Sequence, residues 1–535
     1  MKLLSTILCA AALAGGFTAA AEDAAPTVTL TYATAGEKYL EIYNVRGGGP
    51  YTVDWGDGVV SEPYTSAQGF DVEIKSTTVK IYGDVRMVRT LYNDPQDITA
   101  VDLADNPNCT GLYFPSCQLS AIDVSGCPNI LVLELSDNNI AGKLDLSNLA
   151  SISSISVDGN KLTDLVLPEN TSSWISLNCT GNQLESLNIK GAAGLVELTC
   201  GENLFTSLDL SGCPALEELD CHGNQLVSVD VAGCEALTKL TAYENQLVSV
   251  DVSANKNISS LYLQDNKISD INTEGCAKLS WVNLENNELA EFDGAGLANL
   301  RNLNVVNNHL ASLDLSASPY CGQLFVDNNE LTTLDTSAQG TSLSTFSCSG
   351  NRISSLDLSK NTYLYWFLAS DNELSEIDLS GKAYLQRVEL SNNKLTELDV
   401  TANSGLAEVL VDGNLMEAAA LDAIVNALPD VTSNTTSGDW ARRLDISNNP
   451  GTAEAVTAPA VDKGWTLAAT SGINDAIGAT GAYAVGGAGR IEIVGDASSV
   501  AVYSIAGQSL GSTLDVAPGL YVVTVDGRTF KVAVR

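Results

Sequence analysis

The feature that most constrains the fold of this chain is an asparagine that returns at a nearly constant interval. From residue 138 to residue 414 each step to the next copy is 21 or 22 residues. The surrounding pattern is L-x-x-L-x-L-x-x-N-x-L-x-x-L-D-L-S. Gln96, Cys117 and Asn449 continue the column at its two ends. A fixed period of this length predicts a solenoid, in which every repeat is one structural unit. The column consists of Asn138, Asn160, Asn182, Asn203, Asn224, Asn245, Asn266, Asn287, Asn308, Asn329, Asn351, Asn372, Asn393 and Asn414.

The positions within one repeat have separate structural tasks. The L-x-L segment predicts a short strand, and equivalent strands of successive repeats stack about 4.8 Å apart in a parallel sheet. Their leucines point inward, and because no repeat can bury them alone, the array folds only as a stack. The asparagine amide both donates to and accepts from backbone groups that the turn after the strand leaves unpaired. We therefore expect a mainly β, parallel-sheet solenoid with an asparagine ladder in its core.

This repeat resembles the leucine-rich repeat, and in particular that of internalin-like and Bacteroidetes-type secreted bacterial proteins. The resemblance covers residues 90–465. It implies a leucine-rich-repeat domain that serves as a binding surface for a protein or glycan, as an adhesin does, and not as an enzyme. No cofactor is implied.

The segments before the repeats predict export and a cap. Residues 1–21 have a positive start, an apolar stretch and small residues before Glu22, as a secretory signal peptide has. Residues 22–89 lack the repeat and contain alternating, strand-like stretches, which predicts a small β cap over the first repeat. Its W-G-D-G segment at residues 55–58 resembles polycystic-kidney-disease-type β-sandwich modules. We interpret Trp55 as a core residue.

The segments after Asn414 predict a second cap and a separate module. Residues 415–428 have the apolar spacing of an amphipathic helix that Pro429 ends, and residues 444–465 complete one more repeat. Residues 466–487 have the composition of a linker, and residues 488–535 predict a β-sandwich module. This module resembles the C-terminal sorting domain of type IX secretion cargo, which implies attachment to the outer-membrane surface. A plain β end module is the alternative.

Cysteine and aspartate also occupy fixed columns. Cys179, Cys200, Cys221 and Cys348 replace the second leucine of the strand, and other cysteines fall ten residues after the ladder residue. These positions predict buried ladder residues, with a disulfide between Cys213 and Cys234 as the alternative. An aspartate column in the L-D-L-S segment predicts turn capping, with Ca²⁺ binding along the column as the alternative. It consists of Asp123, Asp145, Asp209, Asp230, Asp251, Asp293, Asp314, Asp335, Asp357, Asp378 and Asp399.

Net charge limits the partners of the chain. The formal charge is −38, from 65 acidic and 27 basic residues. Such a polyanion is repelled by nucleic acid and by anionic membrane surfaces, so we expect neither as a partner. The sequence has no apolar segment long enough to cross a membrane. A partner of basic character fits the charge best.

The variable positions of the strand are left to carry function. Positions two, four and six residues before each ladder residue face outward from the concave sheet. Three aromatic residues on consecutive repeats step back one strand position each, which predicts a diagonal stripe that anchors a partner. The alternative for these aromatic side chains is that they only cover the sheet. The candidate binding residues are Tyr113, Asp220, His222, Tyr243, Tyr262, Trp281, Glu285, Phe325 and Trp366.

Two other functions compete with binding. His222 beside Asp220 resembles a general base with its orienting partner, and Glu218 with Glu285 resembles a glycosidase pair, but an open sheet has no pocket to exclude water. We therefore expect no hydrolase activity. The second competitor is a structural cell-surface spacer that holds Ca²⁺ along the aspartate column.

Overall fold

The structure is a computed structural model that describes residues 25–44, 49–91, 96–103, 106–169, 175–432 and 442–467, together with the strands between residues 483 and 534. The chain divides into two compact units, residues 1–466 and residues 467–535. Each unit is described separately below. The predicted signal peptide, residues 1–21, lies outside the described residues.

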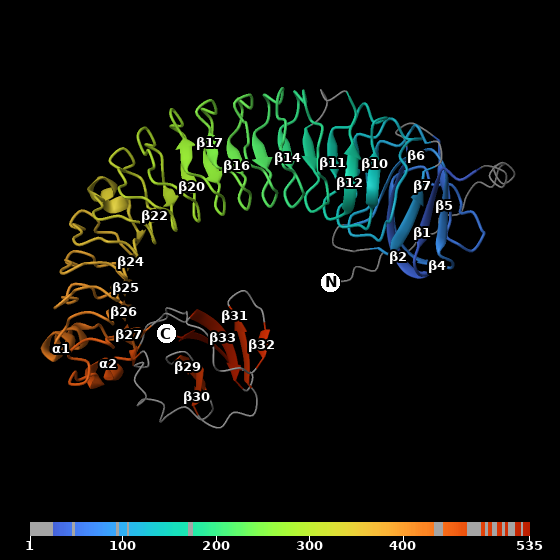
Figure 1. Ribbon diagram of the computed structural model, residues 1–535. Helices are drawn as coiled ribbons and strands as arrows, with labels where there is room; N and C mark the ends of the chain where they lie inside the picture. The colour runs from blue at the N-terminus through green and yellow to red at the C-terminus, as the bar shows by residue number, and fades with distance from the viewer. Residues whose placement is uncertain are drawn as a thin grey trace. The chain divides into compact units, whose positions relative to one another are not determined.

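The first unit is a solenoid with one parallel sheet along its inner side (Figure 1). Each repeat contributes one short strand, and equivalent positions pair throughout, for example Leu198 with Leu219 and Leu219 with Leu240. The predicted leucine-rich-repeat solenoid is therefore confirmed. Its strands are β8 Gly111–Tyr113, β9 Val132–Glu134, β11 Ser154–Ser156, β13 Ser176–Asn178, β14 Glu197–Thr199, β15 Glu218–Asp220, β16 Lys239–Thr241, β18 Ser260–Tyr262, β20 Trp281–Asn283, β21 Asn302–Asn304, β22 Gln323–Phe325, β23 Thr345–Ser347, β24 Trp366–Leu368, β25 Arg387–Glu389, β26 Glu408–Leu410 and β27 Arg443–Asp445.

The outer side of the solenoid consists mostly of turns. Two short parallel pairs stand out, β10 Ala141–Asp145 with β12 Lys161–Val166, and β17 Ser249–Asp251 with β19 Asp270–Asn272. A 3₁₀ helix, Ser337–Ser342, replaces the usual turn in one repeat. Because this side has little ladder pairing, the inner sheet and the buried columns hold the repeats in register.

The asparagine column forms the predicted ladder. Asn245 is typical: its Nδ2 donates to the carbonyls of Cys221, Ala242 and Tyr243 at 3.0, 3.2 and 3.2 Å. Its Oδ1 accepts the backbone N–H of Leu226 at 3.0 Å. Each amide thus joins its own turn to the preceding repeat. The ladder supplies partners to backbone groups that would otherwise be buried without them.

A second column, directly before the ladder residue, adopts a left-handed backbone. In the repeats of Asn245, Asn287 and Asn393 it holds Glu244, Asn286 and Asn392, with φ of +54°, +56° and +54°. Glycine occupies it in five other repeats, at residues 159, 181, 223, 350 and 413, again with positive φ. Glycine and asparagine adopt this conformation at little cost, whereas glutamate does not. The column therefore contains local backbone strain at Glu244.

Replacement of Glu244 by glycine is expected to stabilise the protein. Glu244 is exposed, so Glu244→Gly relieves strain without opening the core, and we expect the free energy of unfolding to rise by about 0.5–1 kcal/mol. The converse variant is Gly181→Ala, whose new Cβ meets nothing closer than 3.6 Å, so that only its φ of +67° matters. It should lose about 1 kcal/mol. Urea titration of both variants measures the two changes in the free energy of unfolding. A change of the same sign in both variants would contradict the prediction.

The cysteines are buried thiols, as predicted. The eleven cysteines of the described residues are all free, so the alternative of a Cys213–Cys234 disulfide is wrong. The thiol of Cys213 instead lies against the carbonyl oxygen of Ile189 in the preceding turn, at 3.5 Å. Burial raises the pKa of the Cys179 and Cys221 thiols to about 12. These side chains therefore act as small apolar ladder residues.

The predicted N-terminal β cap has two sheets, one of which continues into the solenoid. The separate sheet has the order β3 Tyr51–Asp54, β5 Thr78–Gly83, β1 Val28–Tyr32 and β7 Ile98–Asp102. The other sheet joins β4 Gln68–Ile74, β2 Gly36–Asn44 and β6 Val85–Arg89, and β6 then pairs in parallel with β8. The cap and the array therefore share one long sheet.

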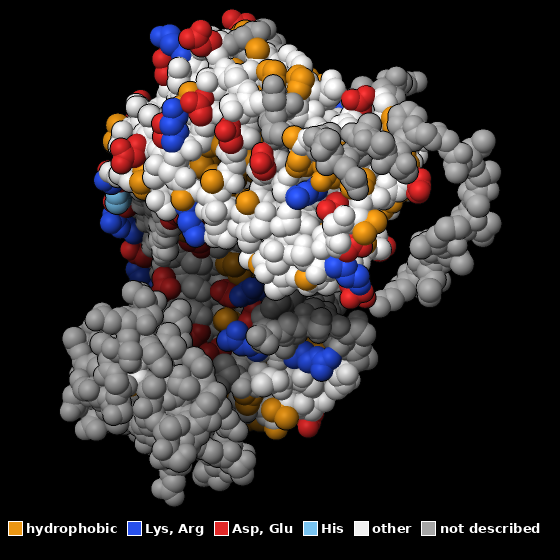
Figure 2. All heavy atoms as spheres, turned by 90° about the vertical axis from the view of Figure 1, so that its right-hand side faces the viewer, with side chains coloured by type: hydrophobic (Ala, Val, Ile, Leu, Met, Phe, Trp, Pro, Cys, Tyr) orange, Lys and Arg blue, Asp and Glu red, His pale blue; other side chains and the backbone are white. Residues whose placement is uncertain are grey.

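Side chains within the cap pack against one another. The ring of Trp55 packs against Phe70, 5.0 Å between centroids, and the carboxylate of Asp54 accepts the backbone N–H groups of Gly56 and Gly58. Trp55 is thus a packing residue, as interpreted from the sequence. On the N-terminal end shown in Figure 2, hydrophobic side chains are scattered among charged ones of both signs. The cap presents a mixed surface where an uncapped solenoid would expose its core.

The C-terminal end of the solenoid is covered by two helices. The predicted amphipathic helix is confirmed as α1 Ala418–Ala427, which buries Leu421, Ile424 and Val425. After β27 the chain forms α2 Ala458–Asp462 and β28 Thr466–Leu467. Trp465 is 3% exposed, and its indole N–H donates to the carbonyl of Pro429 at 2.9 Å. Within the described residues, neither helix is both long and apolar enough to span a membrane.

The second unit contains two antiparallel sheets. One pairs β29 Tyr483–Gly486 with β30 Ile491–Val494, and β29 falls within residues 466–487, which we expected to be a linker. The other has the order β32 Ser509–Gly511, β31 Val500–Ser504, β33 Gly519–Val525 and β34 Arg528–Val534. The segments predicted as strands in this module are β31, β33 and β34.

Candidate binding surface

The concave sheet places the predicted aromatic residues in two separate ring pairs. Tyr262 on β18 and Trp281 on β20 are diagonal neighbours, since Ser260 pairs with Trp281 in the sheet register. Their ring centroids are 6.4 Å apart. Trp281 is 41% exposed, which is high for a tryptophan. The predicted diagonal arrangement is present for this pair.

The second ring pair consists of His222 and Tyr243. Their centroids are 4.6 Å apart and their planes differ by 20°. Nδ1 of His222 lies 2.6 Å from Oδ1 of Asp220, and Nε2 lies 3.6 Å from a carboxylate oxygen of Glu202. Among the ring contacts of the described residues, none joins Tyr243 to Tyr262. The predicted stripe is therefore two rigid anchors on neighbouring repeats and not one continuous row.

The environment of His222 suits binding better than catalysis. The carboxylate of Asp220 and the stacked ring of Tyr243 hold the imidazole in one orientation. Within the described residues, no hydroxyl or thiol is hydrogen-bonded to its ring nitrogens. The arrangement fixes a flat ring on the sheet, but it does not assemble a nucleophile with a base.

A shallow acidic hollow lies beside this ring pair. Its volume is about 160 Å³, and it spans strands β14, β15 and β16. Glu197, Glu218 and Asp220 line it together with Lys239, whose ammonium is 3.6 Å from Glu218. Three carboxylates against one ammonium leave a local excess of negative charge. The hollow therefore suits a basic side chain of a partner.

The remaining candidates on the sheet are spread over its later strands. Glu285 is half-buried and accepts a hydrogen bond from Nδ2 of Asn304 at 3.0 Å, so it is tied to the sheet. Phe325 on β22 is half-buried, and one strand, β23, separates it from Trp366 on β24. Trp366 is 36% exposed, with the guanidinium of Arg387 5.8 Å from its ring centroid. The structure does not bring these three residues together with the ring pairs.

A buried charge network lies next to Trp366 and was not predicted. Glu408 on β26 is fully buried, and its two carboxylate oxygens pair with Arg387 Nε at 2.5 Å and with Arg443 Nη1 at 3.0 Å. Burial raises the pKa of Glu408, while the two guanidinium groups oppose that rise. The network fixes Arg387, which in turn lies over the ring of Trp366. The three charged residues lie on three neighbouring strands, and their spacing in the sequence does not indicate that they pair.

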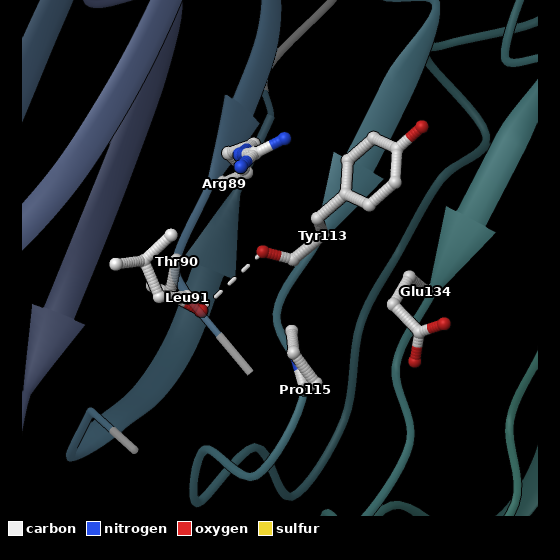
Figure 3. A pocket seen from close by; sticks show the side chains of 6 residues that line it. All are labelled: Arg89, Thr90, Leu91, Tyr113, Pro115 and Glu134. Carbon is white, nitrogen blue, oxygen red and sulfur yellow. Dashed lines mark hydrogen bonds between the residues drawn. The ribbon is translucent and has the colours of Figure 1, made fainter. Parts of the chain in front are cut away.

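Tyr113 lines a pocket at the junction of the cap and the array (Figure 3). Arg89, Tyr113 and Glu134 are register partners on β6, β8 and β9, and they point to the same side of the sheet. The pocket has a volume of about 240 Å³, and Leu91 contributes to its wall. The Arg89 side chain is held by Glu41 of β2, 2.6 Å from its Nε. The cap therefore contributes to the concave surface.

The aspartate column caps turns, as predicted. In each of its eleven members Oδ1 accepts the backbone N–H two residues later, at 2.8–3.1 Å. Hydrogen bonds from Ser147 and Lys143 lower the pKa of Asp145 to about 2. Among the described residues, no three carboxylate, imidazole or thiol groups converge on one point. Ca²⁺ binding along the column stays the untested alternative.

Comparison with known proteins supports the fold. No model of a known protein family matches the sequence, and no curated protein matches it. Among solved structures, the functional domain of InlJ from Listeria monocytogenes, which includes a cysteine ladder, matches with a TM-score of 0.56 and 23% identity over 80% of this chain and 90% of that chain. YopM from Yersinia enterocolitica WA-314 matches with a TM-score of 0.54 and 21% identity over 68% of this chain and 83% of that chain.

A plant protein shares the architecture as well. The peptide hormone receptor RGFR1, solved in complex with RGF2, matches with a TM-score of 0.52 and 19% identity over 66% of each chain. At these identities the likeness concerns the leucine-rich-repeat fold.

Proposed function

We propose that the chain binds a protein partner on its concave sheet, anchored by Tyr243, Tyr262 and Trp281 next to the acidic hollow. The observation that carries this proposal is the position of two ring pairs along the repeats of β15 to β20, the first of which lies beside the three carboxylates of the hollow. Rigid aromatic side chains on a flat sheet supply contact area at low entropic cost. The excess of carboxylates selects a partner of basic character and speeds its approach.

Two further points support binding over catalysis. The concave sheet is open, so water reaches any group on it, and a chemical step gains little there. RGFR1, which shares the fold, was solved with RGF2 bound. We also infer that the chain acts outside the cell or at the cell surface. The sequence of residues 1–21 and the resemblance of residues 488–535 to a sorting domain support that inference.

The test compares the full chain with a variant that carries Tyr243→Ala, Tyr262→Ala and Trp281→Ala. The immobilised proteins capture partners, which are identified by mass spectrometry and then measured by calorimetry. We expect the triple variant to lose at least about a hundredfold in affinity, because central aromatic anchors contribute about 2 kcal/mol or more each. Its melting temperature should change little, since all three side chains lie on the surface of the sheet.

Tyr320→Ala is the matched control, because this tyrosine is 54% exposed but stands in the turn before β22, outside the concave strands. It should keep full affinity. Glu218→Gln with Asp220→Asn should slow association at low salt and affect dissociation less. Equal capture by the triple variant, or capture of a glycan in place of a protein, would contradict the proposal.

A further inference from the structure

A cluster of exposed tyrosines lies just before strands β24 and β25. Tyr363 and Tyr384 both stand nine residues before a ladder asparagine, in consecutive repeats, and Tyr365 follows Tyr363 by two. They are 47%, 46% and 41% exposed. The ring of Tyr384 stacks on those of Tyr363 and Tyr365, with centroids 5.0 and 5.9 Å apart. We call these three residues the tyrosine cluster.

An earlier repeat of this chain has a tyrosine at the position of Tyr363, and there a guanidinium covers the ring. Tyr320 occupies the equivalent position in an earlier repeat, and the guanidinium carbon of Arg301 lies 5.9 Å from its ring centroid. Arg301 stands seven residues before the ladder asparagine of the preceding repeat. At Tyr384 that position holds Tyr365, which stacks on the ring. At Tyr363 it holds Ser344, whose short side chain donates to the carbonyl of Gly322 at 3.0 Å. The place taken by a guanidinium over Tyr320 therefore has no equivalent group over Tyr363.

The chemistry of the ring and the charge of the chain select the occupant. The face of an aromatic ring attracts cations, and guanidinium, being planar and weakly hydrated, stacks on it better than ammonium does. A second guanidinium nearby, that of Arg387, lies over the ring of Trp366. The chain as a whole carries 65 acidic against 27 basic residues, so it attracts cationic segments.

We propose that the tyrosine cluster binds an arginine side chain of a protein partner. The guanidinium takes the place over Tyr363 that Arg301 takes over Tyr320, and the stack with Tyr384 keeps the ring fixed. This surface is separate from the anchors on the concave sheet, and the proposal does not depend on them.

The test titrates the full chain with three blocked peptides in which glycine alternates with arginine, lysine or citrulline, by calorimetry at about 0.15 M salt. We expect the arginine peptide to bind about three- to tenfold more tightly than the lysine peptide, and the citrulline peptide to bind most weakly. Tyr363→Ala combined with Tyr384→Ala should remove the preference for arginine. Tyr262→Ala on the concave sheet should leave that preference in place.

A second variant keeps all three rings. Ser344→Arg supplies a guanidinium from the chain itself and should reduce binding of the arginine peptide to the level of the lysine peptide. Thr238→Arg is the matched control: Thr238 holds the same position in its repeat and also donates to a preceding carbonyl, but the next repeat has Asn257 in place of a tyrosine. It should keep the preference. Equal binding of the arginine and lysine peptides would overturn the proposal. So would equal binding of the citrulline peptide, or an unaltered preference in Ser344→Arg.

Discussion

Asn245→Ala is expected to lower the free energy of unfolding by roughly 3–5 kcal/mol, although it removes only an amide. The substitution leaves the buried N–H of Leu226 without its partner, and it removes one of the two amide donors to the carbonyl of Cys221, the other being Asn224. The orphaned N–H costs about 1–3 kcal/mol, and the lost hydrogen bonds to Cys221, Ala242 and Tyr243 together with the small void add about 2 kcal/mol more. Urea unfolding followed by circular dichroism measures the loss.

Asn257→Ala is the matched control for this prediction. Asn257 is exposed; its Nδ2 donates to the carbonyl of Glu235 at 3.4 Å, and its Oδ1 accepts from the ammonium of Lys278 at 2.7 Å, both in contact with solvent. Its loss should cost less than about 0.5 kcal/mol. Asn245→Asp keeps the acceptor for Leu226 but loses the donors, so it should be strongly destabilising as well. Similar unfolding midpoints for Asn245→Ala and Asn257→Ala would show that the ladder does not carry the stability assigned to it.

Glu408→Ala should be the other large loss, by about 2–3 kcal/mol, because it takes Arg443 away from the buried carboxylate it pairs with and leaves Arg387 with Glu389 alone. Glu408 is fully buried, whereas Arg387 and Arg443 are 24% and 40% exposed. The Arg443 guanidinium then has to turn toward water, and Arg387, held by Glu389 alone, should shift over the ring of Trp366. A change in tryptophan fluorescence should therefore accompany the loss in stability.

An exposed ion pair of the same array provides the comparison for Glu408. Glu373 and Lys394 are 2.8 Å apart, and their side chains are 49% and 55% exposed. Glu373→Gln should cost no more than about 0.5 kcal/mol, since solvent screens this pair. If Glu408→Ala were no more harmful than Glu373→Gln, the buried network would be dispensable. The position of Arg387 would then need another cause.

The repeat made most of the fold predictable, because in a solenoid the same positions of every repeat are buried, so the buried residue types recur with the period. Leucine, cysteine and ladder asparagine recur where the core recurs, so the burial of their columns could be predicted. The stacking of His222 on Tyr243, without a ring contact from Tyr243 to Tyr262, was not predictable. It depends on side-chain rotamers, which residue spacing does not specify.

Other features were missed because they do not follow the period. The pairing of β6 with β8 joins a non-repeating cap to the first repeat, and no residue spacing indicates it. The tyrosine cluster lies nine and seven residues before the ladder asparagine, outside the three outward positions from which binding residues were predicted. A survey of every column for aromatic residues would have found it.

The ladder also has a direction along the chain. Asn245 bonds its own turn and the repeat before it, through Leu226 and Cys221, and the same pattern recurs at Asn449, which reaches back to Val411 and Met416. The ladder amide of a repeat therefore finds its partners in the repeat already made, while groups such as the N–H of Leu226 are paired only when the next repeat is added. The solenoid can therefore fold repeat by repeat from the cap onward during synthesis. Asn449 and the terminal helices form the last repeat of the array.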